Sequence, residues 1–208
     1  FGPIFEALGM TGGSDIDNIK ANMDARCGTD PQAEAQRAAL NAAIAFKKYE
    51  FDAHGIEMNQ RYASDAIVTD EQVEPAFAKD EVLHYQPTTW PGARIPHAWV
   101  FDAIGGKHPT LDLVGGGKFT LLTGLGGRAG GVAAKAVGDA LGIEIACHVI
   151  GPRQTYVDHT GDWARSREIG DAGCVLVRPD QHVCWRSDAL SADPKADLKR
   201  VMTSILAL

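Results

Sequence analysis

The first fifty residues carry apolar positions at helical spacing, and this pattern predicts two helices. Ser14 and Asp17 resemble a capping box, so we expect the first helix to begin there and to end near Gly28. Its apolar positions are Ile16, Ile19 and Met23.

The second predicted helix begins at Asp30 and Pro31, because proline is favoured in the first turn of a helix. Two neighbouring apolar stripes follow, and together they predict a helix with a wide buried face. The stripes comprise Ala33, Leu40 and Ile44, and Ala35, Ala39, Ala42 and Phe46.

Between residues 49 and 107 the helical pattern ends. The stretch HGIEMNQRY (54–62) alternates between apolar and polar residues and predicts a strand, which an acidic loop follows. The stretch QPTTWPGARIPHAW (86–99) contains three prolines. We expect this Pro-rich segment to be extended and to cross a surface.

From residue 108 onward the pattern is the most regular, with short apolar runs typical of strands and longer amphipathic runs typical of helices. The expected elements are strands at 110–114 (TLDLV), 118–123 (KFTLLT) and 143–150 (IEIACHVI), a helix at 130–141 that ends at Gly142, a hairpin of CVLVRP (174–179) and HVCWRS (182–187), and a helix at 194–208. From Lys118 the order is strand, helix, strand, then two strands and a helix. This order predicts an α/β fold with a thioredoxin-like C-terminal domain.

The predicted hairpin places alternate side chains on opposite faces, and we expect one face to be buried. That face comprises Val175, Val177, Val183 and Trp185. Cys174 and Cys184 are expected on the other face. A hairpin centred on Asp180 pairs Leu176 with Cys184, which leaves the two cysteines diagonal, so we expect both thiols to stay reduced.

The composition is that of a globular protein, since 45% of the 208 residues are hydrophobic and 23% are charged. The net charge is −7, and Lys and Arg are scattered, so nucleic acid is not an expected partner. No apolar run reaches the roughly 20 residues of a membrane span, and the first residues lack the cationic flank of a signal peptide. These features predict a soluble, cytoplasmic protein that does not bind membranes.

The glycine-rich stretch VGGGKFTLLTGLGGRAGG (114–131) raises the question of a phosphate site. It fails the Walker pattern, because Asp112 stands where the first glycine belongs and Phe119 stands where a hydroxyl would hold magnesium. The stretch therefore excludes a nucleoside triphosphate site of that type.

The same stretch contains GLGGRA, which satisfies the GxGxxA dinucleotide pattern at Gly124, Gly126 and Ala129. The strand that follows ends in Gly151 and Arg153 rather than in an acid for the ribose. Close packing of a helix on a sheet explains the glycines better than a dinucleotide does.

The cysteines and histidines show no local catalytic or metal-binding pattern. The four cysteines form no CxxC pair, and the seven histidines include no HExxH motif. In a thioredoxin-like unit the reactive CxxC belongs where the first strand meets its helix, and here that place holds GLGGRAGG (124–131). We expect a redox-inactive unit, and we assign no catalytic, cofactor-binding or metal-binding residue within the chain.

Four stretches of the chain are distinctive in combination. They are KKYEFDAHGIEMNQRY (47–62), YQPTTWPGARIPHAWV (85–100), TLDLVGGGKFTLLTG (110–124) and CVLVRPDQHVCWRS (174–187). In this order they resemble the C-terminal part of flavin-dependent phenol hydroxylases of the 2,4-dichlorophenol 6-monooxygenase type. Relatives commonly have glycine where Gln181 stands, so we expect another type of hairpin turn here.

The resemblance implies a parent enzyme that binds FAD, is reduced by NADPH and hydroxylates a phenol beside its hydroxyl group. It also implies that the FAD-binding motifs lie upstream, so that this chain holds no cofactor. Residues 1–107 would then be the tail of the flavin and substrate domains, and residues 108–208 a thioredoxin-like domain without CxxC. The expected partners are the N-terminal flavin portion of the same protein and a second copy in a homodimer.

Three hypotheses about function follow. The first is a C-terminal fragment of a flavin-dependent phenol or chlorophenol monooxygenase, structural or associative by itself, and a chain that opens at Phe1 favours a piece of a longer protein. The second is a free-standing, redox-inactive thioredoxin-like binding module. The third is a small NADP-binding oxidoreductase that uses GLGGRA and Arg153.

Overall fold

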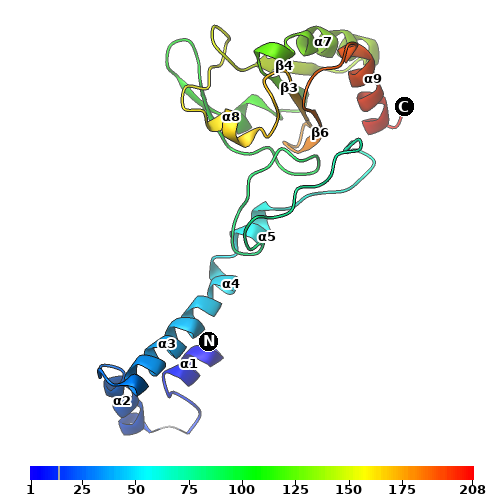
Figure 1. Cartoon of the computed structure of the whole chain (residues 1–208). Helices are drawn as coiled ribbons and strands as arrows, with labels where there is room; N and C mark the ends of the chain where they lie inside the picture. The colour runs from blue at the N-terminus through cyan, green and yellow to red at the C-terminus, as the bar shows by residue number, and fades with distance from the viewer. Residues whose placement is uncertain (14) are drawn as a thin grey trace. The chain divides into compact units, whose positions relative to one another are not determined.

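The computed structural model describes residues 1–13 and 15–208, which form two compact units. The smaller unit comprises Phe1–Glu57 with Asp80–His84, and the larger unit comprises Met58–Lys79 with Tyr85–Leu208. The smaller unit contains helices, whereas the larger unit contains helices and all the described strands (Figure 1).

The smaller unit is built of helices. They are α1 (Gly2–Ala7), α2 (Ile16–Ala25), α3 (Pro31–Phe46), α4 (Lys48–Phe51) and most of α5 (His54–Met58). The carboxylate of Asp15 accepts a hydrogen bond from the amide of Asn18 at 2.8 Å, and that of Asp30 accepts one from the amide of Gln32 at 2.9 Å. These bonds satisfy amide groups at the starts of α2 and α3. The two predicted helices are confirmed, although the predicted cap at Ser14 lies outside the described residues.

The wide buried face predicted for α3 is wrong. Of its residues only Ala33 and Ala43 are buried, whereas Ile44 and Phe46 are 50% and 65% exposed. The smaller unit has too few elements to cover its own apolar stripes. Its exposed large hydrophobic residues include Phe1, Phe5, Met10, Ile16, Met23, Ile44, Phe46, Tyr49, Phe51 and Ile56.

The strand predicted at residues 54–62 is also wrong, because His54–Met58 form the helical turn α5. The amide of Gly55 donates to the carbonyl of Val82 at 3.0 Å, and a Cβ on Gly55 would lie 1.9 Å from the carbonyl oxygen of Glu81. Alternation over a few residues does not distinguish a short helical turn from a strand when a distant segment decides the outcome.

The larger unit contains a four-stranded sheet in the order β4-β3-β5-β6. Its strands are β3 (Phe119–Thr123), β4 (Ile145–Val149), β5 (Cys174–Val177) and β6 (Val183–Ser187). Its long helices are α7 (Ala129–Leu141) and α9 (Pro194–Ile205). β3 is parallel to β4 and antiparallel to β5, and β5 is antiparallel to β6. This order confirms the predicted α/β fold with its thioredoxin-like arrangement.

Helices cover both faces of this sheet. α7 and α9 lie side by side on one face, and the short α8 (Asp162–Ser166) lies beyond the other (Figure 1). The cluster under α7 and α9 includes Leu121, Ala134, Val137, Leu176, Trp185, Leu198, Val201 and Met202. The cluster on the opposite face includes Val100, Leu122, Trp163, Val175, Val177 and Val183. Both faces of the sheet therefore contribute to the core.

A small antiparallel pair precedes the main sheet and was missing from the sequence prediction. β1 (Trp99–Phe101) pairs with β2 (Lys107–Pro109). The pairing joins residues on both sides of the domain boundary predicted between 107 and 108. That boundary stays a prediction about the domains of the parent protein.

The strand predicted at residues 110–114 is wrong, because Thr110–Leu113 form the helical turn α6. The buried Thr110 hydroxyl donates to the carbonyl of Pro96 at 2.6 Å and accepts from the amide of Ala98 at 2.9 Å. These two bonds to a distant segment fix the turn, and the local sequence gave no sign of them.

The Pro-rich segment is extended as predicted, but it is buried rather than spread over a surface. Trp90 and Ile95 are 5% and 2% exposed. The amide of Gly92 donates to the carbonyl of Val183 at 2.7 Å, and the amide of Val183 donates to the carbonyl of Ala93 at 2.8 Å. The segment thus pairs with the outer edge of β6, a place that tolerates neighbouring prolines.

The β5–β6 hairpin is confirmed, but its register differs from the prediction. Leu176 pairs with Trp185 rather than with Cys184, and Val177 pairs with Val183. A bulge between these two pairs leaves Cys184 as the extra residue of β6.

The bulge changes which side chains share a face. Trp185 is buried as predicted, yet it joins Leu176, Cys174 and Cys184 in the cluster under α7 and α9. The three predicted valines, Val175, Val177 and Val183, do share one face. The prediction is wrong for Trp185, which lies on the other. The predicted opposite face is buried as well, because the hairpin lies between two layers.

The hairpin turn contains a residue in a left-handed conformation. Gln181 has a φ of 69°, in the region that favours glycine. Its side-chain amide donates to the carbonyl of Leu111 at 3.0 Å and accepts from the guanidinium of Arg94 at 2.7 Å. These two bonds offset the strain of that conformation.

We predict that a chain of residues 108–208 aggregates, because it lacks the segments that occupy the outer edge of β6. These segments include Val68, whose amide donates to the carbonyl of Cys184 at 2.8 Å, and the Pro-rich segment. A chain of residues 58–208 keeps both and is expected to stay dispersed. Size-exclusion chromatography with light scattering at matched concentrations makes the comparison, and equal behaviour of the two chains would refute the prediction.

Candidate functional site

The glycine-rich turn between β3 and α7 packs against the loop that precedes β5. The amide of Gly126 donates to the carboxylate of Asp171 at 2.9 Å. A Cβ on Gly124 would lie 2.3 Å from the same carboxylate, and one on Gly126 would lie 3.0 Å from Cα of Ala172. The carboxylate of Asp171 thus takes the position at which a phosphate would meet the amide groups of this turn.

This arrangement favours close packing as the reason for the glycines. A Cβ on Gly127 would lie 1.8 Å from the hydroxyl of Thr123, which itself donates to the carbonyl of Gly173 at 2.7 Å. Arg153, the second residue of the NADP hypothesis, lies exposed in the turn after β4. The residues present do not fit a dinucleotide pyrophosphate at this turn.

A charged cluster ties the loop before β5 to the extended segment. The carboxylate of Glu168 accepts from the guanidinium of Arg186 at 2.7 Å, from the hydroxyl of Thr88 at 2.7 Å and from the amide of Thr89 at 3.0 Å. The hydroxyl of Thr89 donates to the carbonyl of Arg167 at 2.6 Å. Glu168 has a φ of 55°, and these bonds hold it in that strained conformation.

The Trp185–Arg186 pair that contributes to the family resemblance has structural partners. The guanidinium of Arg186 donates to the side chain of Gln72 at 3.0 Å. The indole of Trp185 donates to the carboxylate of Asp70 at 2.8 Å, and Asp70 also pairs with Arg200 at 3.0 Å. The pair therefore fastens the 70–72 segment to β6 and α9.

One histidine, His108, forms a local pair with a carboxylate. Within residues 1–13 and 15–208, no group of three or more His, Cys, Asp or Glu side chains is placed to hold a metal ion. Nε2 of His108 lies 2.9 Å from the carboxylate of Asp102, and this hydrogen bond lowers the pKa of Asp102. Asp102 also accepts from the amides of Ile104 and Gly106, so the pair orders the turn between β1 and β2.

Three of the four thiols are withdrawn from water. Burial raises the pKa of Cys147 to about 11 and that of Cys174 to about 12. Burial also raises the pKa of Cys184, whose thiol donates to the carbonyl of Leu176. Cys27 is exposed. Thiols whose pKa is raised by burial are poor nucleophiles at neutral pH.

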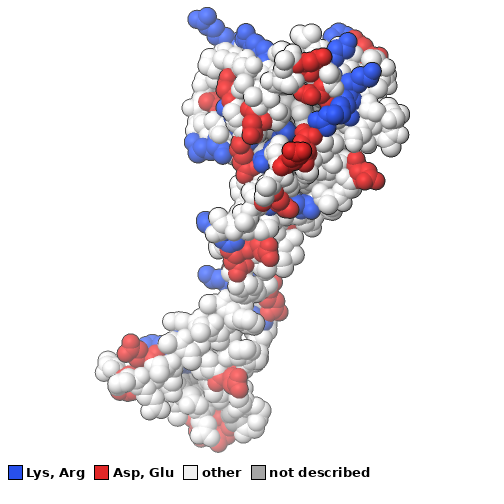
Figure 2. All heavy atoms as spheres, turned by 45° about the vertical axis from the view of Figure 1, so that its right-hand side comes forward, with Lys and Arg blue, Asp and Glu red and all other residues white. Residues whose placement is uncertain are grey.

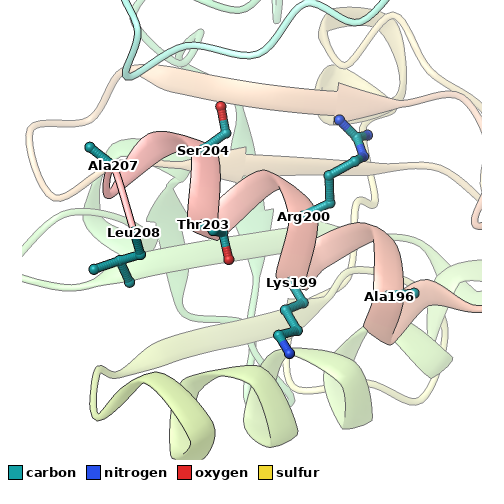
Figure 3. Close-up of a pocket in the computed structure, with 7 residues that line it drawn as sticks. All are labelled: Ala196, Lys199, Arg200, Thr203, Ser204, Ala207 and Leu208. Carbon is teal, nitrogen blue, oxygen red and sulfur yellow. The ribbon is translucent and has the colours of Figure 1, made fainter.

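The outer surface of the larger unit shows mixed charge and a shallow hollow. Figure 2 shows Lys and Arg interspersed with Asp and Glu over this unit on the face in view. A hollow of about 590 Å³ runs along α9, where Lys199 points toward α7 while Arg200 and Ser204 point the other way (Figure 3). Its side chains do not converge on one point, as a catalytic site requires.

No described helix, in residues 1–13 and 15–208, combines the length and the apolar character needed to cross a membrane.

Comparison with known proteins identifies a family and several relatives of this chain. The family described as "Aromatic-ring hydroxylase, C-terminal" matches residues 88–207. The chain is 48% identical to 2,4-dichlorophenol 6-monooxygenase of Cupriavidus pinatubonensis, over 99% of this chain and 34% of that protein. It is 43% identical to phenol 2-monooxygenase of Pseudomonas sp. (strain EST1001), over 97% of this chain and 33% of that protein. The chain thus spans about a third of the length of these relatives.

Two solved structures are similar as well. The flavin-dependent monooxygenase PieE, determined in complex with FAD and substrate, matches with a TM-score of 0.89 and 40% identity, over 99% of this chain and 35% of that chain. Aklavinone-11 hydroxylase, determined with FAD and aklavinone, matches with a TM-score of 0.61 and 34% identity, over 72% of this chain and 26% of that chain.

The fold and the packed glycine turn define a thioredoxin-like α/β unit that has no CxxC pair at its βα turn. Its sheet, helices α6 to α9 and all but the first two residues of the Pro-rich segment fall within the matched region. The chain belongs to the aromatic-ring hydroxylase C-terminal family.

We predict that Gly124→Ala lowers the free energy of unfolding by about 1 to 3 kcal/mol, because the added methyl group overlaps Asp171. Gly12→Ala is the control, since a Cβ there meets no atom within 4 Å. Urea denaturation followed by tryptophan fluorescence measures both. An unchanged midpoint for Gly124→Ala would show that the turn is not closely packed.

The thiols yield a second prediction. At about pH 8, a thiol reagent should rapidly titrate one cysteine of the folded chain, because Cys27 is exposed whereas the other three thiols have a pKa raised by burial and stay protonated. In denaturant it should titrate all four cysteines. Two missing thiols in denaturant would reveal a disulfide and contradict the expectation that Cys174 and Cys184 are reduced.

Proposed function

We propose that this chain is the C-terminal part of a flavin-dependent phenol or chlorophenol monooxygenase, and that by itself it has a structural or associative role. The observation that carries the proposal is the 48% identity to 2,4-dichlorophenol 6-monooxygenase over 99% of the chain. In the proposal the parent binds FAD and uses NADPH, and the chemistry belongs to the flavin rather than to residues of this chain. A cytoplasmic location remains part of the prediction.

The proposal gives each part of the chain a place in the parent. Residues 1–107 are the tail of the flavin and substrate domains, and residues 108–208 are the thioredoxin-like domain. The exposed hydrophobic side chains of α1 to α5 support this division, because a set of helices with so little buried surface needs a covering partner. We propose that the N-terminal flavin portion of the same protein covers them, with a homodimer as the wider assembly.

A free-standing binding module is the alternative function. The two core clusters of the larger unit support it, because a unit with its own core can fold without further chain. The smaller unit argues against a free-standing module. In such a protein Phe46 and Phe51 would stay exposed to water, and exposed apolar patches of this kind are typical of surfaces that bind a partner.

Cofactor retention tests the proposal. The purified chain, incubated with excess FAD and passed through gel filtration, should emerge without flavin absorbance and should show no phenol-dependent oxidation of NADPH. Co-expression with the upstream portion of a relative should give a complex that retains FAD. Stoichiometric FAD on the chain alone would refute the proposal, as would failure of the two portions to associate.

Variants of α3 test whether the upstream flavin portion binds the chain through this helix. Ile44→Asp with Phe46→Asp should weaken the complex at least tenfold, because both side chains lie on the exposed apolar surface of α3. Ile104→Asp is the matched control, since Ile104 is 94% exposed and belongs to the larger unit. Equal effects of the two changes would argue against docking through α3.

A further inference from the structure

A cavity of about 310 Å³ lies in the larger unit and takes no part in the proposed function. Its walls combine apolar and charged side chains, which is the composition of small-molecule sites. The lining residues that matter are Arg61, Phe77, Lys79, Tyr85, Pro87 and Glu168.

Arg61 is a buried cation at this cavity, with a side chain only 10% exposed. One end of its guanidinium, Nη1, donates to the carboxylate of Glu74 at 2.9 Å and to the carbonyl of Pro75 at 2.6 Å. The ring of Phe77 lies 4.1 Å from the guanidinium carbon. Nε is buried without a hydrogen-bond partner. A buried donor without a partner is costly, and the Nε edge of a guanidinium is one that carboxylates bind with two parallel hydrogen bonds.

The charges around the cavity favour an anion. Two cationic side chains, those of Arg61 and Lys79, line it. Glu168 also lines it, but its charge is matched by Arg186 at 2.7 Å. Glu74, the partner of Arg61, is 56% exposed, so water screens its charge.

The remaining walls select the shape of the ligand. Burial raises the pKa of Tyr85. Together with Pro87 it gives the cavity an apolar wall. Such a wall suits an aromatic ring, and the volume is at the small end of ligand sites.

We propose that this cavity binds a small aromatic carboxylate, whose carboxylate is bound by the guanidinium of Arg61 and whose ring lies against Tyr85 and Pro87. The site is separate from the cofactor chemistry of the proposed parent. Its success or failure therefore leaves the proposed function unaffected.

The test is a calorimetric titration of the whole 208-residue chain with benzoate, and with phenol as the ligand that lacks the carboxylate. Benzoate should bind saturably, and phenol at least tenfold more weakly. Arg61→Lys keeps the charge but removes the planar fork, and it should weaken benzoate binding at least tenfold. Arg165→Lys is the matched control, because Arg165 is also ion-paired, with Asp162, and should leave the affinity unchanged.

Two further variants keep the test decisive if Arg61→Lys unfolds the loop. Tyr85→Ala removes the ring that would contact the ring of benzoate, and it should weaken benzoate binding several-fold. Ala78→Leu fills the cavity that Ala78 lines and should abolish binding without touching Arg61. Absence of saturable binding, equal binding of phenol, or full affinity in both of these variants would overturn the proposal.

Discussion

The outer edge of β6 is the constraint on which the larger unit depends. An edge strand presents amide and carbonyl groups that need partners, and an uncovered edge is a template for aggregation. Here the chain itself supplies the partners, from Val68 and from the Gly92–Ala93 stretch, which lie far from β6 in sequence. The segment between the helical unit and the sheet is therefore part of the sheet's structure rather than a linker.

The Pro-rich segment can cover that edge only if it is held in one position. The buried guanidinium of Arg186 holds it there through hydrogen bonds. Arg186 is 9% exposed, and removing such a group from water is costly unless every donor is matched. Its partners Glu168, Gln72 and Thr89 come from three different segments. An ion pair of this kind adds little net stability compared with apolar packing, but it specifies which segments meet. The strained φ of Glu168 is consistent with a position determined by its contacts.

The limits of sequence prediction follow from the same contacts. The helices α3 and α7 were predictable, because Asp30 with Pro31 and the glycine at 142 mark their ends locally. α5 and α6 were not, since hydrogen bonds from Gly55 and Thr110 to distant carbonyls, those of Val82 and Pro96, decide their conformations. The sequence prediction assigned no site residues for the same reason. Arg61 is recognised as a candidate only in the folded structure, where the loop that carries Phe77 lies against its guanidinium.

The bulge in β6 shows how a single residue moves a side chain to the other face. Alternation assigns Trp185 to the face of Val183, and this holds only while each residue has one partner. With Cys184 unpaired, Trp185 turns toward α9 and its indole reaches Asp70. No local pattern distinguishes the two outcomes, because both place tryptophan in a buried layer. The contact with Asp70 favours the observed one, since it satisfies the indole donor that burial would otherwise leave unpaired.

The βα turn of this chain holds a carboxylate contact where thioredoxin-like units can carry a CxxC pair. At this turn a thioredoxin-like unit can use helix amide groups to stabilise a thiolate. In this chain Gly126 instead donates to the carboxylate of Asp171, and Gly124 allows that loop to approach. Asp171 would repel a second anion at the same amide. A side chain on Gly124 would displace the carboxylate of Asp171. The amide of this turn thus makes an internal contact, which packs the loop before β5 against the start of α7.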